Sequence, residues 1–421
     1  MQPHVKVFEN GMRLVFKKVE KNRPATVFVS VKAGSINEDE SNNGISHFIE
    51  HLNFKGTEKR TAKQISTQLE EIGANANAFT SKYATCFFAT VLPEQIENCF
   101  EILSDLVFNS KYDKEDIERE RQVIFEEIDM YQDDPESVCY EEFCKNFYVG
   151  SPMQRTILGT KESLANITRE DILDYISKRY VAKNIVVSVV GDFTVDQVKK
   201  LTQKYFSNKF KSKSEVDEIG KGTVVIPDKK FSFIKKDVAQ THIVFGFPCD
   251  NIYSESRMAH TLCGFIFGGG MGSRLFQKIR EEHGLVYSIS CMPEMYALGG
   301  NFVVSLGTNK KNEKKALEFI KEQIDLLVKD GFKQEELDRA KTFCKSLLLS
   351  SGEMGSDIAK TNASNLRTYN KIISIEERLN KVDSVTLDDI NEVAKKVFNY
   401  SNMCGCVVSN NPNEELFKIF D

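Results

Sequence analysis

Residues 168–192, TREDILDYISKRYVAKNIVVSVVGD, align without a gap with residues 386–410, TLDDINEVAKKVFNYSNMCGCVVSN. Seven positions are identical, among them the leading threonine and an aspartate three residues later. Each stretch predicts a helix that begins after a threonine N-cap and is followed by a buried strand. The chain is therefore expected to contain two copies of one structural unit.

An earlier pair of segments supports the repeat. Residues 26–54 and residues 241–269 share the order strand, polar turn and helix. The segment between the halves, SNKFKSKSEVDEIGKG at residues 207–222, is charged and has no periodicity, which is typical of a linker. We expect an α+β fold with two homologous domains, 1–206 and 223–421, each a mainly antiparallel sheet packed with helices, arranged as a clamshell.

Composition narrows the class of protein. A chain of 421 residues is too long to fold around one hydrophobic core, so we expect at least two domains. Its composition, with 41% hydrophobic and 28% charged residues, is typical of globular proteins. A net charge of −5 does not favour nucleic acid, and no apolar run reaches the roughly 20 residues of a membrane helix. The ten cysteines are scattered, and the N-terminus predicts a β-hairpin turning at Asn10-Gly11 rather than a signal peptide. We expect a cytoplasmic protein with reduced thiols.

The segment ISHFIEHL, residues 45–52, predicts a short helix with two different faces. The opposite side from the apolar stripe carries His47, Glu50 and His51. The stripe itself consists of Ile45, Phe48, Ile49 and Leu52. Two imidazoles at i and i+4 can converge on one zinc ion, and Glu50 is placed to reach a water molecule beside it. The alternative is a solvated polar face. The corresponding positions of the second copy lack these residues.

A catalytic zinc site usually needs a third protein ligand. The helix EDIERERQVIFEEIDMY, residues 115–131, offers candidates. Its buried side is expected to include Ile117, Ile124, Ile128 and Tyr131. Glu120 and Glu127 fall within an arc bounded by Val123 and Phe125, whereas Glu118 and Glu126 point away. Two carboxylates on a buried arc are costly unless they are paired or bind metal, so one is a ligand candidate and the other a supporting candidate. The alternative is a glutamate paired with an arginine.

These motifs, HFIEH, the FKGT that follows at residues 54–57, and ERERQVIFEEI, resemble the pitrilysin family of zinc peptidases. The similar branch contains mitochondrial processing peptidase and its short bacterial relatives. The resemblance implies one zinc ion per chain, held by His47, His51 and Glu127. It implies that Glu50 is the general base and that Glu120 orients the ligands.

The resemblance also implies where a peptide substrate binds. GANANAFTS, residues 73–81, is similar to the family's substrate-binding edge strand, which selects Asn77, Ala78, Phe79 and Thr80. REEHGLVY supplies Arg280 and Tyr287, which the family uses on the scissile carbonyl. GGGMGSRLF, residues 268–276, resembles a glycine-rich loop of processing peptidases. The structural alternatives are a plain sheet strand, a solvated arginine with a packed tyrosine, and a loop that ends a helix.

The sequence therefore predicts a zinc-dependent endopeptidase that acts on unfolded peptides or extended tails. A modest preference for basic residues near the cleavage point follows from the resemblance through Asp133, Asp134, Glu136 and Glu141. The alternative function is a non-catalytic peptide-binding or assembly scaffold subunit. We expect a homodimer rather than a chain that needs a different, metal-free partner, with no nucleic acid or membrane partner.

Overall fold

The computed structural model describes residues 2–21, 23–210 and 227–421. The first sheet has six strands in the order β1-β2-β6-β3-β5-β4. Neighbouring strands are antiparallel except β2 and β6, which are parallel. The strands are β1 (His4–Val7), β2 (Arg13–Lys18), β3 (Ala25–Val31), β4 (Asn75–Thr80), β5 (Thr85–Val91) and β6 (Ile185–Gly191). The open edge of this sheet beside the candidate site is β4.

The second sheet repeats this topology with five strands in the order β7-β11-β8-β10-β9. It has one parallel pair, β7 with β11, at the place of the parallel pair β2 with β6. The strands are β7 (Lys230–Lys235), β8 (Thr241–Cys249), β9 (Val286–Tyr296), β10 (Gly299–Thr308) and β11 (Cys404–Ser409). The predicted α+β fold with two homologous, mainly antiparallel sheets is confirmed.

The aligned stretches that predicted the repeat form the same elements. Thr168 caps α7 (Arg169–Arg179) and Thr386 caps α14 (Leu387–Val397), each by accepting a hydrogen bond from the backbone N–H of the aspartate three residues on. The strands that follow, β6 and β11, are buried along their whole length. The N-terminal hairpin is also confirmed, with Gly11 in the left-handed region at φ 91°.

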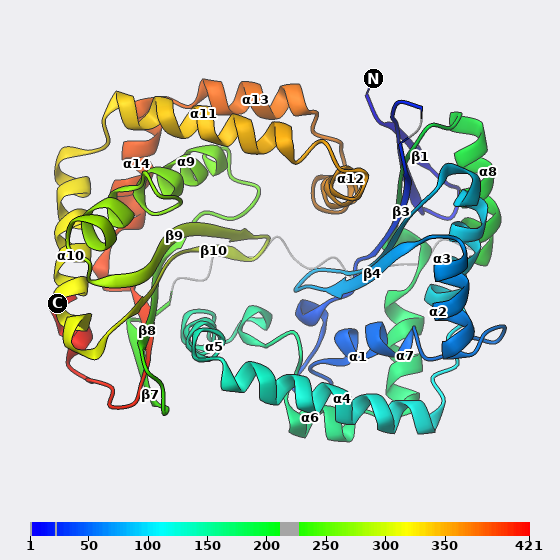
Figure 1. Cartoon of the computed structure of the whole chain (residues 1–421), viewed down its shortest axis with the longest axis horizontal. Helices are drawn as coiled ribbons and strands as arrows, with labels where there is room; N and C mark the ends of the chain where they lie inside the picture. The colour runs from blue at the N-terminus through cyan, green and yellow to red at the C-terminus, as the bar shows by residue number, and fades with distance from the viewer. Residues whose placement is uncertain (1, 22, 211–226) are drawn as a thin grey trace. The chain divides into compact units, whose positions relative to one another are not determined.

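Helices cover both faces of the first sheet (Figure 1). One face packs against α1 (Ile45–Leu52), α3 (Ile96–Phe108) and α8 (Val195–Tyr205), with α2 (Ala62–Glu71) and α4 (Lys114–Asp133) completing that layer. The other face packs against α12 (Gly355–Tyr369), whose Ala359, Ala363 and Leu366 lie on Phe28 and Val186. In Figure 1, α12 lies on the opposite side of β3 from α3 and α8.

Two helices are exchanged between the halves of the chain. Although α5 (Pro135–Phe147) comes from the first half, it packs against β7, β8 and β11 of the second sheet. Conversely, α12 comes from the second half and packs on the first sheet. The chain therefore divides into a first unit of residues 1–128, 155–218 and 348–377, and a second unit containing the rest.

The remaining described α-helices are α6 (Lys161–Asn166), α9 (Arg257–Phe267), α10 (Glu313–Asp330), α11 (Gln334–Ser350) and α13 (Ile375–Ser384). Of the predicted linker, Ser207–Lys209 forms a short 3₁₀ turn, and residues 211–222 lie outside the described residues. All ten cysteines lie within the described residues, where each is buried and none forms a disulfide. Among the helices that are described, none is both long and apolar enough to cross a bilayer.

Candidate metal centre

Helix α1 carries the histidines, and its local sequence explains its position. Its apolar stripe is fully packed, since Ile45, Phe48, Ile49 and Leu52 are each 1% exposed or less. This confirms the predicted stripe. The helix begins after Gly44, which has φ 95° and lies so close to the chain at Leu158 that a Cβ would be 2.4 Å from its carbonyl oxygen. Glycine is required there.

A buried carboxylate holds the beginning of α1. Glu38 is 3% exposed, and its Oε2 accepts hydrogen bonds from the Gly44 N–H and Asn43 Nδ2, each at 2.8 Å. Its Oε1 accepts from the Ser46 N–H at 3.0 Å. Burial raises the pKa of Glu38, and these hydrogen bonds oppose the rise without cancelling it. A carboxylate at this end also complements the helix dipole. Sequence reasoning missed Glu38 because an acidic residue in a polar turn carries no distinct pattern.

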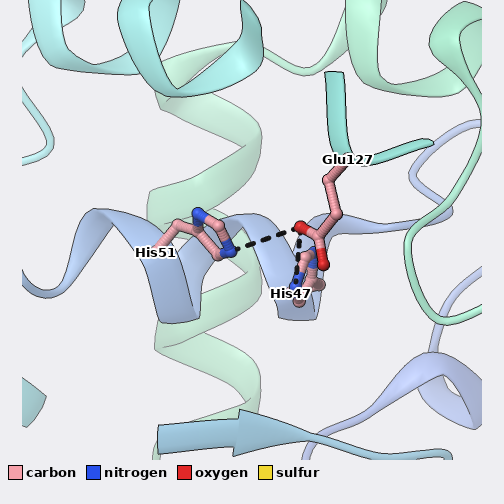
Figure 2. Close-up of side chains that lie close together, drawn as sticks. All are labelled: His47, His51 and Glu127. Atoms are coloured by element: carbon pink, nitrogen blue, oxygen red, sulfur yellow. Dashed lines mark ion pairs between the residues drawn. The ribbon is translucent and has the colours of Figure 1, made fainter. Parts of the chain in front are cut away.

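Three potential ligand atoms converge on the side of α1 opposite its apolar stripe. Oε2 of Glu127, from α4, lies 3.7 Å from Nε2 of His47 and 3.7 Å from Nε2 of His51. One ligand atom from each residue lies within 4.8 Å of the other two. Figure 2 shows the Glu127 carboxylate turned toward both imidazoles, which project from α1. The structure thus brings the three predicted ligands together.

The spacing of these atoms fits a cation better than hydrogen bonds. At 3.7 Å the nitrogen–oxygen distances exceed normal hydrogen-bond lengths. Tetrahedral zinc with bonds of about 2.0–2.1 Å separates neighbouring ligand atoms by about 3.3 Å, which is close to the observed spacing. Two imidazoles and one carboxylate are a common zinc ligand set, so the residues present fit zinc.

The protonation of the imidazoles also suits a metal. His47 is 8% exposed, and its pKa is lowered to about 3 by burial and then by the nearby His51. It is therefore neutral near pH 7. Its Nδ1 is buried and has no hydrogen-bond partner among the described residues. For His51, Oε2 of Glu120 lies 3.4 Å from Nδ1. A carboxylate only accepts, so this contact places the proton on Nδ1 and leaves Nε2 free for a ligand role.

Glu120 is the more deeply buried glutamate of α4. It is 2% exposed, while Glu118 and Glu126 are exposed as predicted. Its charge is paired with Lys55, whose Nζ lies 2.7 Å from Oε1. The alternative prediction was a glutamate paired with an arginine; the cation that pairs with Glu120 is instead a lysine. Lys55 was missed because it lies in the turn after the end of α1, where helical spacing no longer places side chains.

The predicted burial of α4 was partly wrong. Ile117 and Ile124 are buried, but Val123 is 45% exposed and Tyr131 is 39% exposed. Tyr131 belongs to the part of α4 that follows residue 128 and is counted with the second unit. Helical periodicity extrapolated through the whole helix therefore failed at Tyr131, where the helix leaves the first unit, and also at Val123 within that unit.

Glu50 is held by the edge strand. Thr80 Oγ1 donates a hydrogen bond of 2.6 Å to Oε2 of Glu50. Burial raises the pKa of Glu50, the hydrogen bond from Thr80 and the proximity of His51 lower it, and Glu127 raises it, with a net rise. A carboxylate in this setting takes up a proton more readily than an ordinary glutamate. Thr80 was selected as a substrate-binding residue; its contact with Glu50 was not foreseen.

The predicted substrate strand is an edge of the first sheet. Asn77, Ala78, Phe79 and Thr80 lie in β4, which pairs only with β5 in the described sheet. Ala78 packs toward the helical core together with Ala76, whereas Phe79 contacts Phe28 and Phe88 on the other face. Peptide binding by these residues stays a prediction, and an open edge is what it requires.

Arg280 and Tyr287 lie in the second unit, whereas the histidine cluster lies in the first. Arg280 and Tyr287 lie close to one another within the second unit. The Arg280 guanidinium lies 4.6 Å from the ring centroid of Phe276 and 5.8 Å from that of Tyr287. Tyr287 is 73% exposed, so it is not a packed tyrosine. The helical segment Phe276–Glu282 is followed by Gly284, which lies in the left-handed region at φ 58°.

The acidic residues selected for substrate arginine also lie in the second unit. Asp134 is the N-cap of α5, and its Oδ2 accepts hydrogen bonds from the N–H and Oγ of Ser137. Asp133 and Glu136 are exposed. Asp134 therefore has a structural partner, Asp133 and Glu136 have solvent-facing side chains, and Glu141 is half-buried on α5.

Comparisons with known proteins agree with this geometry. Residues 13–161 match the family model described as Insulinase (Peptidase family M16), and residues 166–343 match the model described as Peptidase M16 inactive domain. An uncharacterized zinc protease of Rickettsia felis is 33% identical over 94% of this chain and 95% of its own length. The chain belongs to peptidase family M16. The pitrilysin resemblance is thereby confirmed.

Other M16 relatives cover the chain almost completely. An uncharacterized zinc protease of Bacillus subtilis is 31% identical over 93% of this chain and 94% of its own length. The crystal structure of a protease from Helicobacter pylori shares the fold with a TM-score of 0.89 at 24% identity, covering 97% of this chain and 99% of that one. A Pseudomonas fluorescens structure described as a peptidase M16 inactive domain gives the same TM-score at 18% identity, covering 98% of each chain.

Proposed function

We propose that this M16 chain is a zinc-dependent endopeptidase with one zinc ion, bound by His47, His51 and Glu127. The observation that carries the proposal is the convergence of two imidazoles of α1 on the Glu127 carboxylate, each 3.7 Å from it, with the carboxylate of Glu50 on the same helix as the two histidines. The relatives from Rickettsia and Bacillus that are named zinc proteases support zinc as the metal.

Three residues of the first unit would support catalysis at the zinc site in different ways. Zinc at this site would supply Lewis-acid polarisation of a peptide carbonyl and a more acidic water molecule. Glu50 would take a proton from the attacking water and return it to the leaving nitrogen, a role that suits its raised pKa. Thr80 would hold Glu50 in place, and Glu120 would orient His51 through Nδ1. Arg280 and Tyr287 stay predicted partners of the scissile carbonyl.

The open edge of β4 supports an extended peptide as substrate. A peptide that pairs with this edge must present a free backbone, so unfolded chains and extended tails are the proposed substrate class. The acidic residues at the end of α4 and the beginning of α5 motivate a modest preference for basic side chains near the cleavage point. We also propose a cytoplasmic homodimer; the mass of the purified chain in solution tests the dimer.

The decisive experiment combines metal analysis with cleavage of a quenched fluorescent peptide. Purified protein is expected to contain about one zinc per chain, to cleave the peptide, and to lose cleavage when a chelator removes the metal. Glu50→Gln is expected to keep zinc and peptide binding but to lose turnover. Peptide binding without any zinc-dependent turnover would instead identify a non-catalytic scaffold of the same fold.

A further inference from the structure

One face of β4 carries an aromatic cluster beside a lysine. The Phe79 ring lies 6.2 Å from Phe28 and 6.4 Å from Phe88 between centroids. From α12, Nζ of Lys360 lies 4.9 Å from the centroid of the Phe79 ring. Lys360 is exposed, and β4 is the last strand of its sheet. The ammonium group therefore lies over the last aromatic ring before the open edge.

A second cation lies behind the first. Arg367, seven residues after Lys360 on α12, donates a hydrogen bond of 2.8 Å to Ser30 Oγ. Ser30, Cys86 and Phe79 are paired in one row across β3, β5 and β4. Within the described part of the chain, no carboxylate oxygen lies within 4.0 Å of the charged nitrogens of Lys360 or Arg367. Lys360 and Arg367 therefore have no carboxylate ion-pair partner among the described residues.

The two faces of β4 would meet different side chains of an added strand. Thr80 points to the face of Glu50, and Phe79, one residue earlier, points to the face of α12. Residues directly opposite one another on neighbouring strands point to the same face, with Cβ atoms about 4.5–5.5 Å apart. The substrate residue paired with Phe79 would therefore project toward Lys360, and its two neighbours would project toward the Glu50 side.

We propose that the position paired with Phe79 is a subsite for an acidic side chain of the substrate, aspartate or glutamate. The inference rests on the proposed peptidase function and names a feature of its substrates. The Phe79 ring packs against the methylene part of such a side chain, and Lys360 pairs with its carboxylate. This preference concerns a different substrate position from the basic one, whose acidic residues lie in the second unit.

The test uses full-length Glu50→Gln protein loaded with zinc, so that binding is measured without turnover. Fluorescent ten-residue peptides carry one glutamate, moved one position at a time, and each is compared with its glutamine counterpart. Glutamate is expected to bind about threefold tighter than glutamine at one position and equally at the adjacent positions. Adding Lys360→Glu should abolish or invert that preference.

The matched control is Lys200→Glu, an exposed lysine on α8, which packs against β2 rather than β4. It makes the same charge change and should leave the preference intact. The inference is overturned if no position prefers glutamate, if the preference survives Lys360→Glu, or if no peptide binds. A different result is also informative. If the glutamate preference depends on Lys360 but the unsubstituted protein cleaves no peptide, the proposed peptidase function is wrong and the acidic subsite is supported.

Discussion

Thr80 on the edge strand and Glu50 on α1 are joined by a hydrogen bond of 2.6 Å, from Oγ1 to Oε2. The strand proposed to hold the substrate thus also holds the proposed base. A peptide that pairs with β4 would align on the element that fixes the carboxylate acting on it. Substrate position and base position are therefore set by the same few residues.

Thr80→Val removes this hydrogen bond while keeping the side-chain shape. A hydrogen bond to a charged group contributes about 1.5–3 kcal/mol, so kcat/KM is expected to fall by about 10- to 100-fold. Thr80→Ser should retain most of the activity because it keeps the hydroxyl. Steady-state kinetics on one quenched peptide checks both variants. Equal rates for valine and threonine would show that Glu50 does not depend on this contact.

Glu127→Gln should weaken zinc binding by more than the 10- to 100-fold that is typical of supporting residues, because it removes a proposed ligand. Competition with a chromogenic chelator measures the affinity without any need for activity. Glu126→Gln is the matched control, since the neighbouring glutamate is exposed. Similar zinc affinities for the two variants would remove Glu127 from the metal site.

Lys55→Met leaves the carboxylate of Glu120, which is 2% exposed, without its cation. The cost to the free energy of unfolding is expected to be about 1–3 kcal/mol, below that of a fully buried pair because Lys55 is partly exposed. Urea unfolding of the metal-free protein measures it. Adding Glu120→Gln to Lys55→Met should recover part of the loss, and a double variant no more stable than Lys55→Met would contradict the pairing.

Asp250 gives a pH-dependent contribution to stability in the second unit. Burial alone raises its pKa, but hydrogen bonds from Lys396, Ser256 and Ser254 hold the pKa at about 2, below the ordinary 3.8. A depressed folded-state pKa stabilises the protein above about pH 4, and that stability is lost as the pH falls toward 2. Asp250→Asn should cost about 1–2 kcal/mol at pH 7 after allowance for solvent screening. Urea midpoints of the two proteins should approach one another as the pH falls from about 4 toward 2; a constant gap would contradict the assignment.

The exchange of α5 and α12 predicts how fragments behave. Residues 1–206 expressed alone lack α12, so Phe28, Cys86 and Val186 of the first sheet would be exposed to solvent. This fragment is expected to bind a hydrophobic dye and to show poor NMR dispersion. Co-expression with residues 207–421 should restore a compact complex, seen by size-exclusion chromatography. A fragment 1–206 that is monomeric and well dispersed by itself would show that α12 is dispensable.

Much of the fold and the cluster follows from local patterns. The repeat beginning at Thr168 and Thr386 predicts two equivalent units because capping and periodicity are local properties. The spacing of His47 and His51 places two imidazoles on one face for the same reason. The exchange of α5 and α12 could not be predicted, because either helix has an apolar face that suits either sheet. Lys360 reaches Phe79 only through that exchange, since nearly 300 residues separate them in the sequence.

The exchanged helices also constrain the history of the chain. Each copy of the duplicated unit has a sheet covered by a helix from the other copy. Deleting one copy, transferring it to another gene or replacing it with an unrelated domain would therefore expose a sheet face of the remaining copy. The copy that lacks the counterparts of His47 and His51 would therefore be retained by mutual dependence, whether or not it has any chemistry of its own. Selection on the copy that carries His47 and His51 would then preserve both.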